Sequence, residues 1–266
     1  MPTLAVNGTE LYYEDTGPGS TGETIAFMHG LLWDASLFAP QIAALRDRYR
    51  CVAWDHRGQG RSASDRRHCI DMELCTQDAV ALLAALGIAR CHLAGLSMGG
   101  FVAMRLAARR PQLVGKLILI DTSADPEQLE NVPRYRMLSR VARLLGPRII
   151  AKRVAPIMLG ASILHDPGRR AEVSRYLMVM TARRDVWRAV NGVIDRAGCV
   201  DELPQIAAPC LVLVGDEDVA TTPVKAAQLT AAIRGARLVH IPRAGHSSTV
   251  ESPREVIAAI EHFLRE

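Results

Sequence analysis

Apolar, β-branched runs alternate with helically patterned stretches along most of this 266-residue chain, and this alternation restricts its fold more than any other feature. A short apolar run without polar alternation is typical of a strand buried on both faces of a parallel sheet. Helices between such strands cover both faces of the sheet. The runs are TIAFMH (24–29), RCVAWD (50–55), RCHLAGL (90–96), KLILID (116–121), CLVLVG (210–215) and ARLVHI (236–241).

The stretches between these runs predict helices, and the N-terminus predicts a hairpin. Apolar residues recur at helical spacing over 36–48, 72–86, 98–110, 223–234 and 253–264. The opening LAVNGTELYYED alternates and breaks at Asn7-Gly8, a pair that favours a tight turn between two strands. We therefore expect a protein of the α/β class, with a mostly parallel sheet of about eight strands flanked by helices.

One connection interrupts the alternation. Residues 122–208 separate two predicted strands by far more chain than one crossover helix requires, so we expect several short helices rather than a flexible linker. Proline and glycine punctuate the segment at Pro133, Gly146, Pro147, Gly160, Pro167 and Gly168. The sequence thus predicts a core of residues 1–121 and 209–266, into which 122–208 is inserted as a helical cap.

Arginine is concentrated in the predicted cap. Between Thr122 and Val200 lie 13 arginines and one lysine against seven acidic residues, a net charge of +7 in a chain whose total is +4. Such charges usually lie on solvated helix faces, but a basic segment can also steer an anionic substrate. The total charge is too small to indicate nucleic-acid binding.

The overall composition favours a globular protein, with 49% hydrophobic and 23% charged residues. The first thirty residues lack the pattern of a signal peptide, and no stretch reaches the roughly 18 uncharged apolar residues of a membrane span. Six cysteines have no C-x-x-C spacing, which argues against a zinc or redox motif. We expect a soluble, cytoplasmic protein without a nucleic-acid or membrane partner, and the sequence does not predict its oligomeric state.

The stretch GLSMGG (95–100) lies where a predicted strand meets a predicted helix and has three glycines in six residues. Gly-x-Ser-x-Gly at such a junction is the nucleophile elbow, a strained turn that exposes the serine hydroxyl above the sheet. Side chains at 95 and 99 would collide with the neighbouring strand and helix, which explains the glycines. Ser97 is therefore the candidate nucleophile, at a helix N-terminus that favours negative charge.

A serine hydroxyl needs a positioned base to accept its proton, and eight histidines compete for that role. His246 follows a predicted strand and a glycine in IPRAGHSSTVESP and precedes the last helix, so its loop can return the side chain to the carboxyl edge of the sheet. We predict that His246 is the base. Five other histidines are less suited to this role. His92 and His240 lie in predicted strands, where packing or hydrogen bonding is expected; His68 and His165 lie in polar loops, and His262 lies on the last helix.

The base in turn needs a carboxylate that holds its tautomer and stabilises the imidazolium. LVLVGDEDVATTP ends a strand with three acids, of which Asp218 is far enough beyond the strand to reach over the sheet edge. Asp216 should turn away with the chain. Asp121, at the end of KLILID, is the main rival because another strand tip could also present a carboxylate. We favour Asp218.

An acyl-transfer site also needs hydrogen-bond donors for the oxyanion. The Met98 N–H supplies one, and the loop after TIAFMHG should supply another, most simply from Leu31. In that loop His29 is expected to order the backbone, whereas Trp33 either lines the substrate pocket or caps a helix. Six large side chains of the cap are pocket or cap-core candidates: Met137, Leu138, Tyr176, Met178, Met180 and Trp187.

These motifs resemble those of the α/β-hydrolases over nearly the whole chain. MHGLLWD, DHRGQGRS, GLSMGG, GDEDVATTP and GHSSTVESP occur in family order. The resemblance implies the chain order Ser…Asp…His with Asp218 as the acid, a structural role for Asp55 and Arg57, and a helical cap at 122–208. GLSMGG looks most like the 3-oxoadipate enol-lactonase-like branch and related small esterases. Serine at position 97 argues against the dehalogenase and epoxide hydrolase relatives, which use aspartate there.

The predicted function is hydrolysis of a carboxylic ester or lactone by Ser97, His246 and Asp218, with no metal and no cofactor. An anionic substrate is compatible with the arginine-rich cap. Three alternatives remain open at this point. The same residues can serve hydrolysis of a C–C bond or cofactor-free perhydrolysis, and a protein of this fold can act as a ligand receptor with little turnover.

Overall fold

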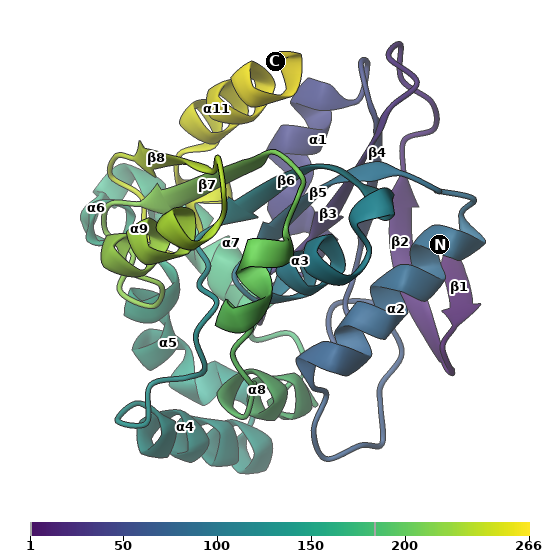
Figure 1. Cartoon of the computed structure of the whole chain (residues 1–266). Coiled ribbons are helices and arrows are strands. Elements are labelled where there is room, and N and C mark those ends of the chain that lie inside the picture. The colour runs from purple at the N-terminus through teal and green to yellow at the C-terminus, as the bar shows by residue number, and fades with distance from the viewer. Residues whose placement is uncertain (1, 184) are drawn as a thin grey trace.

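Eight strands form one sheet in the computed structural model, which describes residues 2–183 and 185–266 (Figure 1). Their spatial order is β1-β2-β4-β3-β5-β6-β7-β8. Strand β2 is antiparallel to both β1 and β4, and all other pairs are parallel. The strands are β1 (Thr3–Val6), β2 (Thr9–Asp15), β3 (Thr24–Met28), β4 (Arg50–Trp54), β5 (Cys91–Leu96), β6 (Val114–Ile120), β7 (Cys210–Gly215) and β8 (Arg237–Ile241).

The predicted α/β sheet is confirmed, including its N-terminal hairpin. Asn7 and Gly8 connect β1 to β2 with φ angles of 46° and 70°, so both turn residues adopt the left-handed backbone that the tight hairpin requires. Five of the six predicted central strands are buried along almost their whole length. The exception is β8, in which only Ile241 is buried, because β8 lies at the edge of the sheet.

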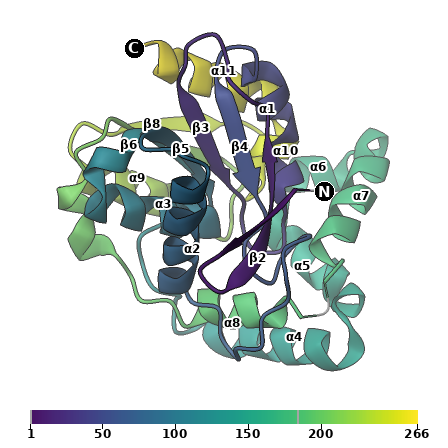
Figure 2. The same cartoon turned by 90° about the vertical axis from the view of Figure 1, so that its right-hand side faces the viewer.

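Helices cover both faces of the sheet, as Figures 1 and 2 show. In β3, Ile25 and Phe27 pack on one face, whereas Ala26 and Met28 pack on the other, as the two-residue repeat of a strand requires. The first face carries α1 (Ala39–Leu45) and α11 (Pro253–Arg265), and the second carries α2 (Met72–Ala85), α3 (Met98–Arg109) and α9 (Pro223–Ala232). The helix predicted over 36–48 begins as a 3-10 turn, η1 (Ala35–Phe38), and continues as α1.

The long connection between β6 and β7 folds into short helices, as its length and breakers predicted. The helices are α4 (Val132–Leu145), η3 (Pro147–Ile150), α5 (Ala151–Met158), α6 (Ala161–His165), η4 (Pro167–Arg169), α7 (Arg170–Met180) and α8 (Trp187–Ile194). Helix α4 ends before Gly146, whose φ is 94°, and α6 begins after Gly160. Figure 1 shows α4, α5 and α8 together on one side of the sheet.

The end of this connection returns to the sheet. The 3-10 helix η5 (Val200–Gln205) follows α8, and its Leu203 joins the same buried cluster as the residues of α3. The division into a core and a cap of residues 122–208 remains a prediction. Two further short elements are η2 (Pro111–Leu113) and α10 (Ser248–Glu251). Within the described residues, no helix has both the length and the apolar character needed to cross a membrane.

Candidate active site

Ser97 lies at the turn between β5 and α3, in a strained backbone conformation. Its φ is 51° and its ψ is −111°, a region that residues with side chains rarely adopt. The Ser97 N–H donates to the Ile120 carbonyl (2.9 Å), and the Thr122 hydroxyl donates to the Ser97 carbonyl (2.9 Å). These bonds to β6 and the residues after it fix the turn.

The glycines on either side of Ser97 allow the close packing of this turn. A Cβ at position 95 would overlap the Gly99 carbonyl, and a Cβ at position 99 would overlap the Met28 carbonyl of β3. The prediction that side chains at 95 and 99 would collide with the neighbouring strand and helix is therefore confirmed.

Three polar side chains from three loops form one hydrogen-bonded chain at the carboxyl edge of the sheet. Ser97 Oγ lies 2.8 Å from His246 Nε2, and His246 Nδ1 lies 2.8 Å from Asp218 Oδ2. Asp218 follows β7 and His246 follows β8, so parallel strands bring together residues far apart in sequence. The arrangement matches a nucleophile, a base and an orienting acid.

Asp218 is held by a complete set of donors. Its Oδ1 accepts from the N–H groups of Ala220 (2.8 Å) and Thr221 (2.9 Å), and its Oδ2 accepts from the Thr221 hydroxyl (2.7 Å) as well as from His246. Sequence analysis did not identify Thr221, although the ATTP after Asp218 offered two hydroxyls at a range suited to a local turn.

Asp121, the rival acid, does not contact His246. Its carboxylate accepts from the Gly215 N–H (2.9 Å) and the Ser248 N–H (3.0 Å), so it ties β6 to β7 and to the loop after β8. Burial, together with the nearby Asp218 charge, raises the pKa of Asp121 to about 7. The structure thus places Asp218, and not Asp121, beside the imidazole.

The electrostatics of the pair favour a charged imidazole. Burial alone would lower the pKa of His246, but the Asp218 charge and its hydrogen bond outweigh burial and raise it. Burial alone would also raise the pKa of Asp218, but the charge of His246 and the hydrogen bonds from His246 and Thr221 lower it. Asp218 is therefore an anion that stabilises the protonated base.

Leu31 lies in the loop after β3, and Met98 is the first residue of α3, directly after Ser97. Within residues 2–183 and 185–266, neither N–H donates to a protein acceptor. Gln59 contacts both segments. Its Oε1 accepts from the Leu32 N–H (3.0 Å), and its Nε2 lies 3.4 Å from Met98 Sδ at the start of α3. Sequence analysis did not identify Gln59, which is buried in the DHRGQGRS turn.

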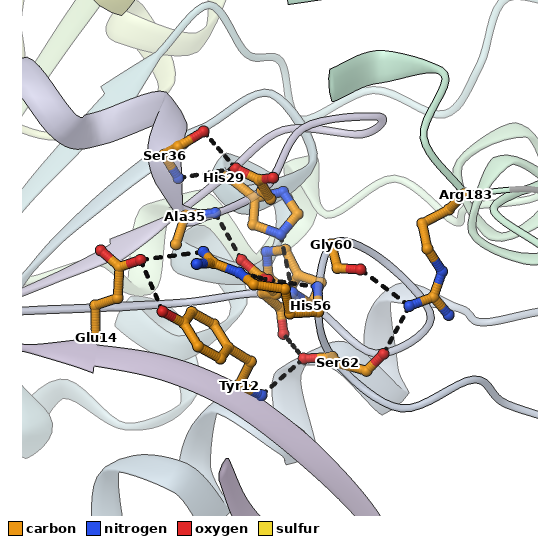
Figure 3. A network of polar contacts seen from close by, with 12 residues as sticks. Tyr12, Glu14, His29, Ala35, Ser36, His56, Gly60, Ser62 and Arg183 are labelled. Carbon is orange, nitrogen blue, oxygen red and sulfur yellow. Dashed lines mark hydrogen bonds and ion pairs between the residues drawn. The ribbon is translucent and has the colours of Figure 1, made fainter. Parts of the chain in front are cut away.

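His29 orders the first of these loops, as predicted. Its Nδ1 lies 2.7 Å from the Gly30 carbonyl, and its Nε2 accepts from the His56 N–H (2.9 Å). Figure 3 shows this contact within a wider network that includes Ser62 and Arg183. Arg183, which precedes α8, donates to the Gly60 and Ser62 carbonyls (2.9 Å each) and so anchors the inserted helices to this turn.

The structural role implied for Asp55 and Arg57 agrees with their contacts. Asp55 accepts from the Ala35 N–H (2.7 Å) and the Arg61 N–H (2.6 Å). The buried Arg57 pairs with Asp65 (2.9 Å) and with Asp78. Neither side chain lines the cavity beside Ser97.

A cavity of about 150 Å³ separates Ser97 and His246 from the inserted helices. Its wall is mainly apolar and comes from α3, α4, α5, α8 and the end of α7, with Leu31 and Thr221 beside the reacting groups. The wall residues that sequence analysis did not identify include Phe101, Ala142, Ile150, Val154, Met158 and Val193. Two charged residues also line it, Glu127 and Arg196.

Three of the pocket candidates, Leu138, Met180 and Trp187, line this cavity, whereas Tyr176 and Met178 do not. Met137 does not line it, because Met137 lies on the outer face of α4 with 51% of its surface exposed, whereas the adjacent Leu138 points inward. Trp33 does not line it either. Its indole N–H donates to Ser247 Oγ (3.2 Å), and its ring packs edge-on against Tyr176.

Fold and site together define an α/β-hydrolase, and the protein is a hydrolytic enzyme. The chain belongs to the family described as "Serine aminopeptidase, S33", whose family model matches residues 19–253. Among curated proteins, a carbamate hydrolase, RutD, of Caulobacter sp. (strain K31) is 29% identical over 270 residues, covering 99% of this chain and 98% of the relative.

Two solved structures resemble the whole chain. A thermophilic esterase from Thermogutta terrifontis has a TM-score of 0.89 and 31% identity, with 99% of this chain and 96% of that chain covered. An enol-lactonase from Burkholderia xenovorans LB400 has a TM-score of 0.90 and 31% identity, with both chains covered completely. The predicted resemblance to the α/β-hydrolases is confirmed.

Proposed function

We propose that this protein hydrolyses a carboxylic ester or lactone through an acyl-enzyme formed on Ser97. The observation that carries the proposal is the hydrogen-bonded chain from Ser97 through His246 to Asp218 at the floor of an apolar cavity. The resemblance to an esterase and an enol-lactonase, each at 31% identity, supports the same reaction class.

In the proposed mechanism His246 Nε2 accepts the Ser97 proton as Oγ attacks the substrate carbonyl carbon. The N–H groups of Leu31 and Met98 donate to the oxyanion of the tetrahedral intermediate. His246 then returns the proton to the leaving alcohol oxygen. A water molecule then gives a proton to His246 and attacks the acyl-enzyme carbonyl carbon. As this second tetrahedral intermediate collapses and releases the acid, His246 returns the proton to Ser97 Oγ, which restores both residues. Throughout, Asp218 accepts a hydrogen bond from Nδ1 and stabilises the imidazolium.

The cavity wall indicates that the non-reacting part of the substrate is largely apolar and without net charge. Of the cap-segment arginines that the structure describes, only Arg196 lines the cavity, and Glu127 neutralises it (2.9 Å). The other arginines whose contacts the structure describes form surface ion pairs or lie over aromatic rings, as Arg136, Arg169 and Arg143 do. None of these three arginines lines the cavity.

Hydrolysis of matched substrates by purified protein tests the proposal. We expect turnover of 4-nitrophenyl butyrate and a lower kcat/KM, by at least about tenfold, for a carboxylate-bearing enol-lactone, since burying an unpaired charge is costly. Ser97→Ala protein serves as the blank. Cleavage of a carbamate without any turnover of esters or lactones would contradict the proposed substrate class. A preference for the anionic lactone would show that the apolar cavity wall does not determine which substrate is selected.

Ser97→Ala and His246→Ala test the mechanism. Each should lower kcat by about 10³- to 10⁶-fold, because nucleophile and base act as a unit. Circular dichroism and the melting temperature should show that both variants fold. Full activity in either folded variant would rule out the proposed mechanism.

A further inference from the structure

One charged pair lies in the otherwise apolar wall of the catalytic cavity. Arg196 Nη1 and Glu127 Oε2 are 2.9 Å apart, and the two side chains are only 4% and 12% exposed. Both residues line the cavity that contains Ser97 and His246. A buried ion pair adds little net stability compared with apolar residues of similar volume, so stability alone does not account for its position there.

Arg196 uses three of its five N–H donors within the protein. Its Nε donates to the Asp125 carbonyl (3.1 Å), and its Nη1 donates to the Val193 carbonyl (2.7 Å) as well as to Glu127. These bonds connect the segment after β6 to α8. The two Nη2 donors have no acceptor within residues 2–183 and 185–266. Structural hydrogen bonds thus account for Nε and Nη1 of the guanidinium, but not for Nη2.

The guanidinium packs against the helix that begins directly after the nucleophile. Its central carbon lies 4.4 Å from the centroid of the Phe101 ring, and the Phe101 N–H donates to the Ser97 carbonyl (3.0 Å). Arg196 therefore sits over the side chain that is one helical turn beyond the nucleophile. Phe101 also lines the cavity, so its ring supports the guanidinium at the wall.

A second unused polar group lies in the same part of the cavity. Tyr135 of α4 lines the wall, and within the described part of the chain its hydroxyl has no hydrogen-bond partner. Burial raises the pKa of Tyr135, and the Glu127 charge raises it further, which keeps the phenol protonated. Tyr135 is therefore a second donor in the cavity wall that Arg196 also lines.

We propose that Arg196 Nη2 and the Tyr135 hydroxyl bind a neutral hydrogen-bond acceptor, a carbonyl or ether oxygen, on the non-reacting part of the ester or lactone. This inference rests on the proposed function and specifies its substrate class. The acceptor is neutral because Glu127 already balances the guanidinium charge, so a carboxylate there would face Glu127 without a free countercharge. Arg196 is thus a specificity residue.

Three 4-nitrophenyl esters with the same five-carbon acyl chain test the proposal: the pentanoate, the 4-oxopentanoate and the glutarate monoester. Each kcat/KM is measured for the unaltered protein and for every variant, so that the intrinsic reactivity of an ester cancels when the proteins are compared. For the unaltered protein we expect the 4-oxo ester to exceed the pentanoate by about 10- to 100-fold, the range for a hydrogen bond to a charged group. The glutarate ester should be the poorest of the three.

Arg196→Met should reduce the ratio of 4-oxo ester to pentanoate by at least about tenfold, whatever its effect on the pentanoate itself. Tyr135→Phe should reduce the same ratio by a smaller factor. Glu127→Gln should raise the ratio of glutarate ester to 4-oxo ester by at least about tenfold, because it frees the guanidinium charge. Arg136→Met is the matched control, since Arg136 forms an ion pair with Asp195 outside the cavity.

The outcomes separate this inference from the proposed function. If the unaltered protein hydrolyses none of the three esters, the proposed function itself fails. If it hydrolyses the 4-oxo ester and the pentanoate with similar kcat/KM, or if folded Arg196→Met keeps the original ratio, the function stands and the acceptor site is overturned. Should Arg196→Met not fold, unchanged ratios in both Tyr135→Phe and Glu127→Gln would overturn the site instead.

Discussion

At the scale of single residues, the proposed reaction depends on whether His246 is neutral. Only the neutral imidazole can accept the Ser97 proton, and the Asp218 charge raises the pKa of His246 above its ordinary value of 6.5. The kcat/KM for a neutral ester should therefore rise with pH along a limb whose midpoint lies above 6.5. A midpoint at or below 6.5 would mean that burial outweighs Asp218.

Asp218→Asn tests the cause of that raised pKa. Without the carboxylate, burial should dominate, so the pKa of His246 should fall below that of the unaltered protein. Because the acid also holds the tautomer, kcat should drop by about 10⁴-fold. NMR titration of labelled histidine measures the pKa directly, without relying on the residual activity. An unchanged pKa in this variant would show that Asp218 does not control the base.

At the scale of elements, one buried carboxylate connects the His246 loop to the inserted helices. Glu251, the last residue of α10, accepts from the Ser247 N–H (3.1 Å) and from the Gly160 N–H (2.8 Å) that precedes α6. Ser247 directly follows His246, so Glu251 is a candidate positioning residue. Sequence analysis did not identify this role, because GHSSTVESP does not show which distant amide the glutamate meets.

Glu251→Gln should lower kcat by about tenfold and destabilise the fold by about 1–3 kcal/mol, since an amide has one acceptor oxygen where two N–H groups need one each. The matched control is Glu217→Gln. Glu217 also binds the inserted segment, through the Ser162 N–H (2.8 Å) and hydroxyl, but it does not touch Ser247. Chemical unfolding and steady-state kinetics of both variants should show similar losses of stability and a loss of kcat only at position 251. Equal kcat values in the two variants would show that Glu251 has a structural role alone and does not position His246.

Regular elements were predictable because each is specified by its own residues. The apolar runs and the helical spacing gave positions for the strands and helices of the core, and parallel pairing then brought the strand ends with Ser97, Asp218 and His246 to one edge. The exposure of β8 was not predictable in this way. Its apolar pattern resembles that of a central strand, and only the strand order, a property of the whole sheet, places it at the edge.

At the scale of the whole molecule, the cavity depends on how the inserted helices dock against the sheet. Consecutive positions on a helix point about 100° apart, so the rotation of α4 about its axis decides whether Met137 or Leu138 faces the cavity. No local pattern fixes that rotation. It is set by long-range contacts such as those of Arg183 and Arg196, which join the inserted helices to the DHRGQGRS turn and to the segment after β6.

The same long-range packing gives the whole fold a pH-dependent stability through Asp121, which ties together the ends of β6 and β7 and the start of α10. Its pKa is raised from 3.8 to about 7 by burial, so folding favours the protonated form. Its contribution to stability is thus present in full below about pH 4 and is lost as pH rises towards 7.

The Asp121→Asn variant tests this. It removes the titrating group and one hydrogen-bond acceptor, and the lost acceptor alone should lower the free energy of unfolding by about 1–3 kcal/mol at every pH. The stability advantage of the unaltered protein over the variant, measured by urea unfolding at several pH values, should therefore narrow between about pH 4 and 7. An advantage that widens with pH would show that the N–H groups of Gly215 and Ser248 outweigh burial and hold Asp121 as an anion.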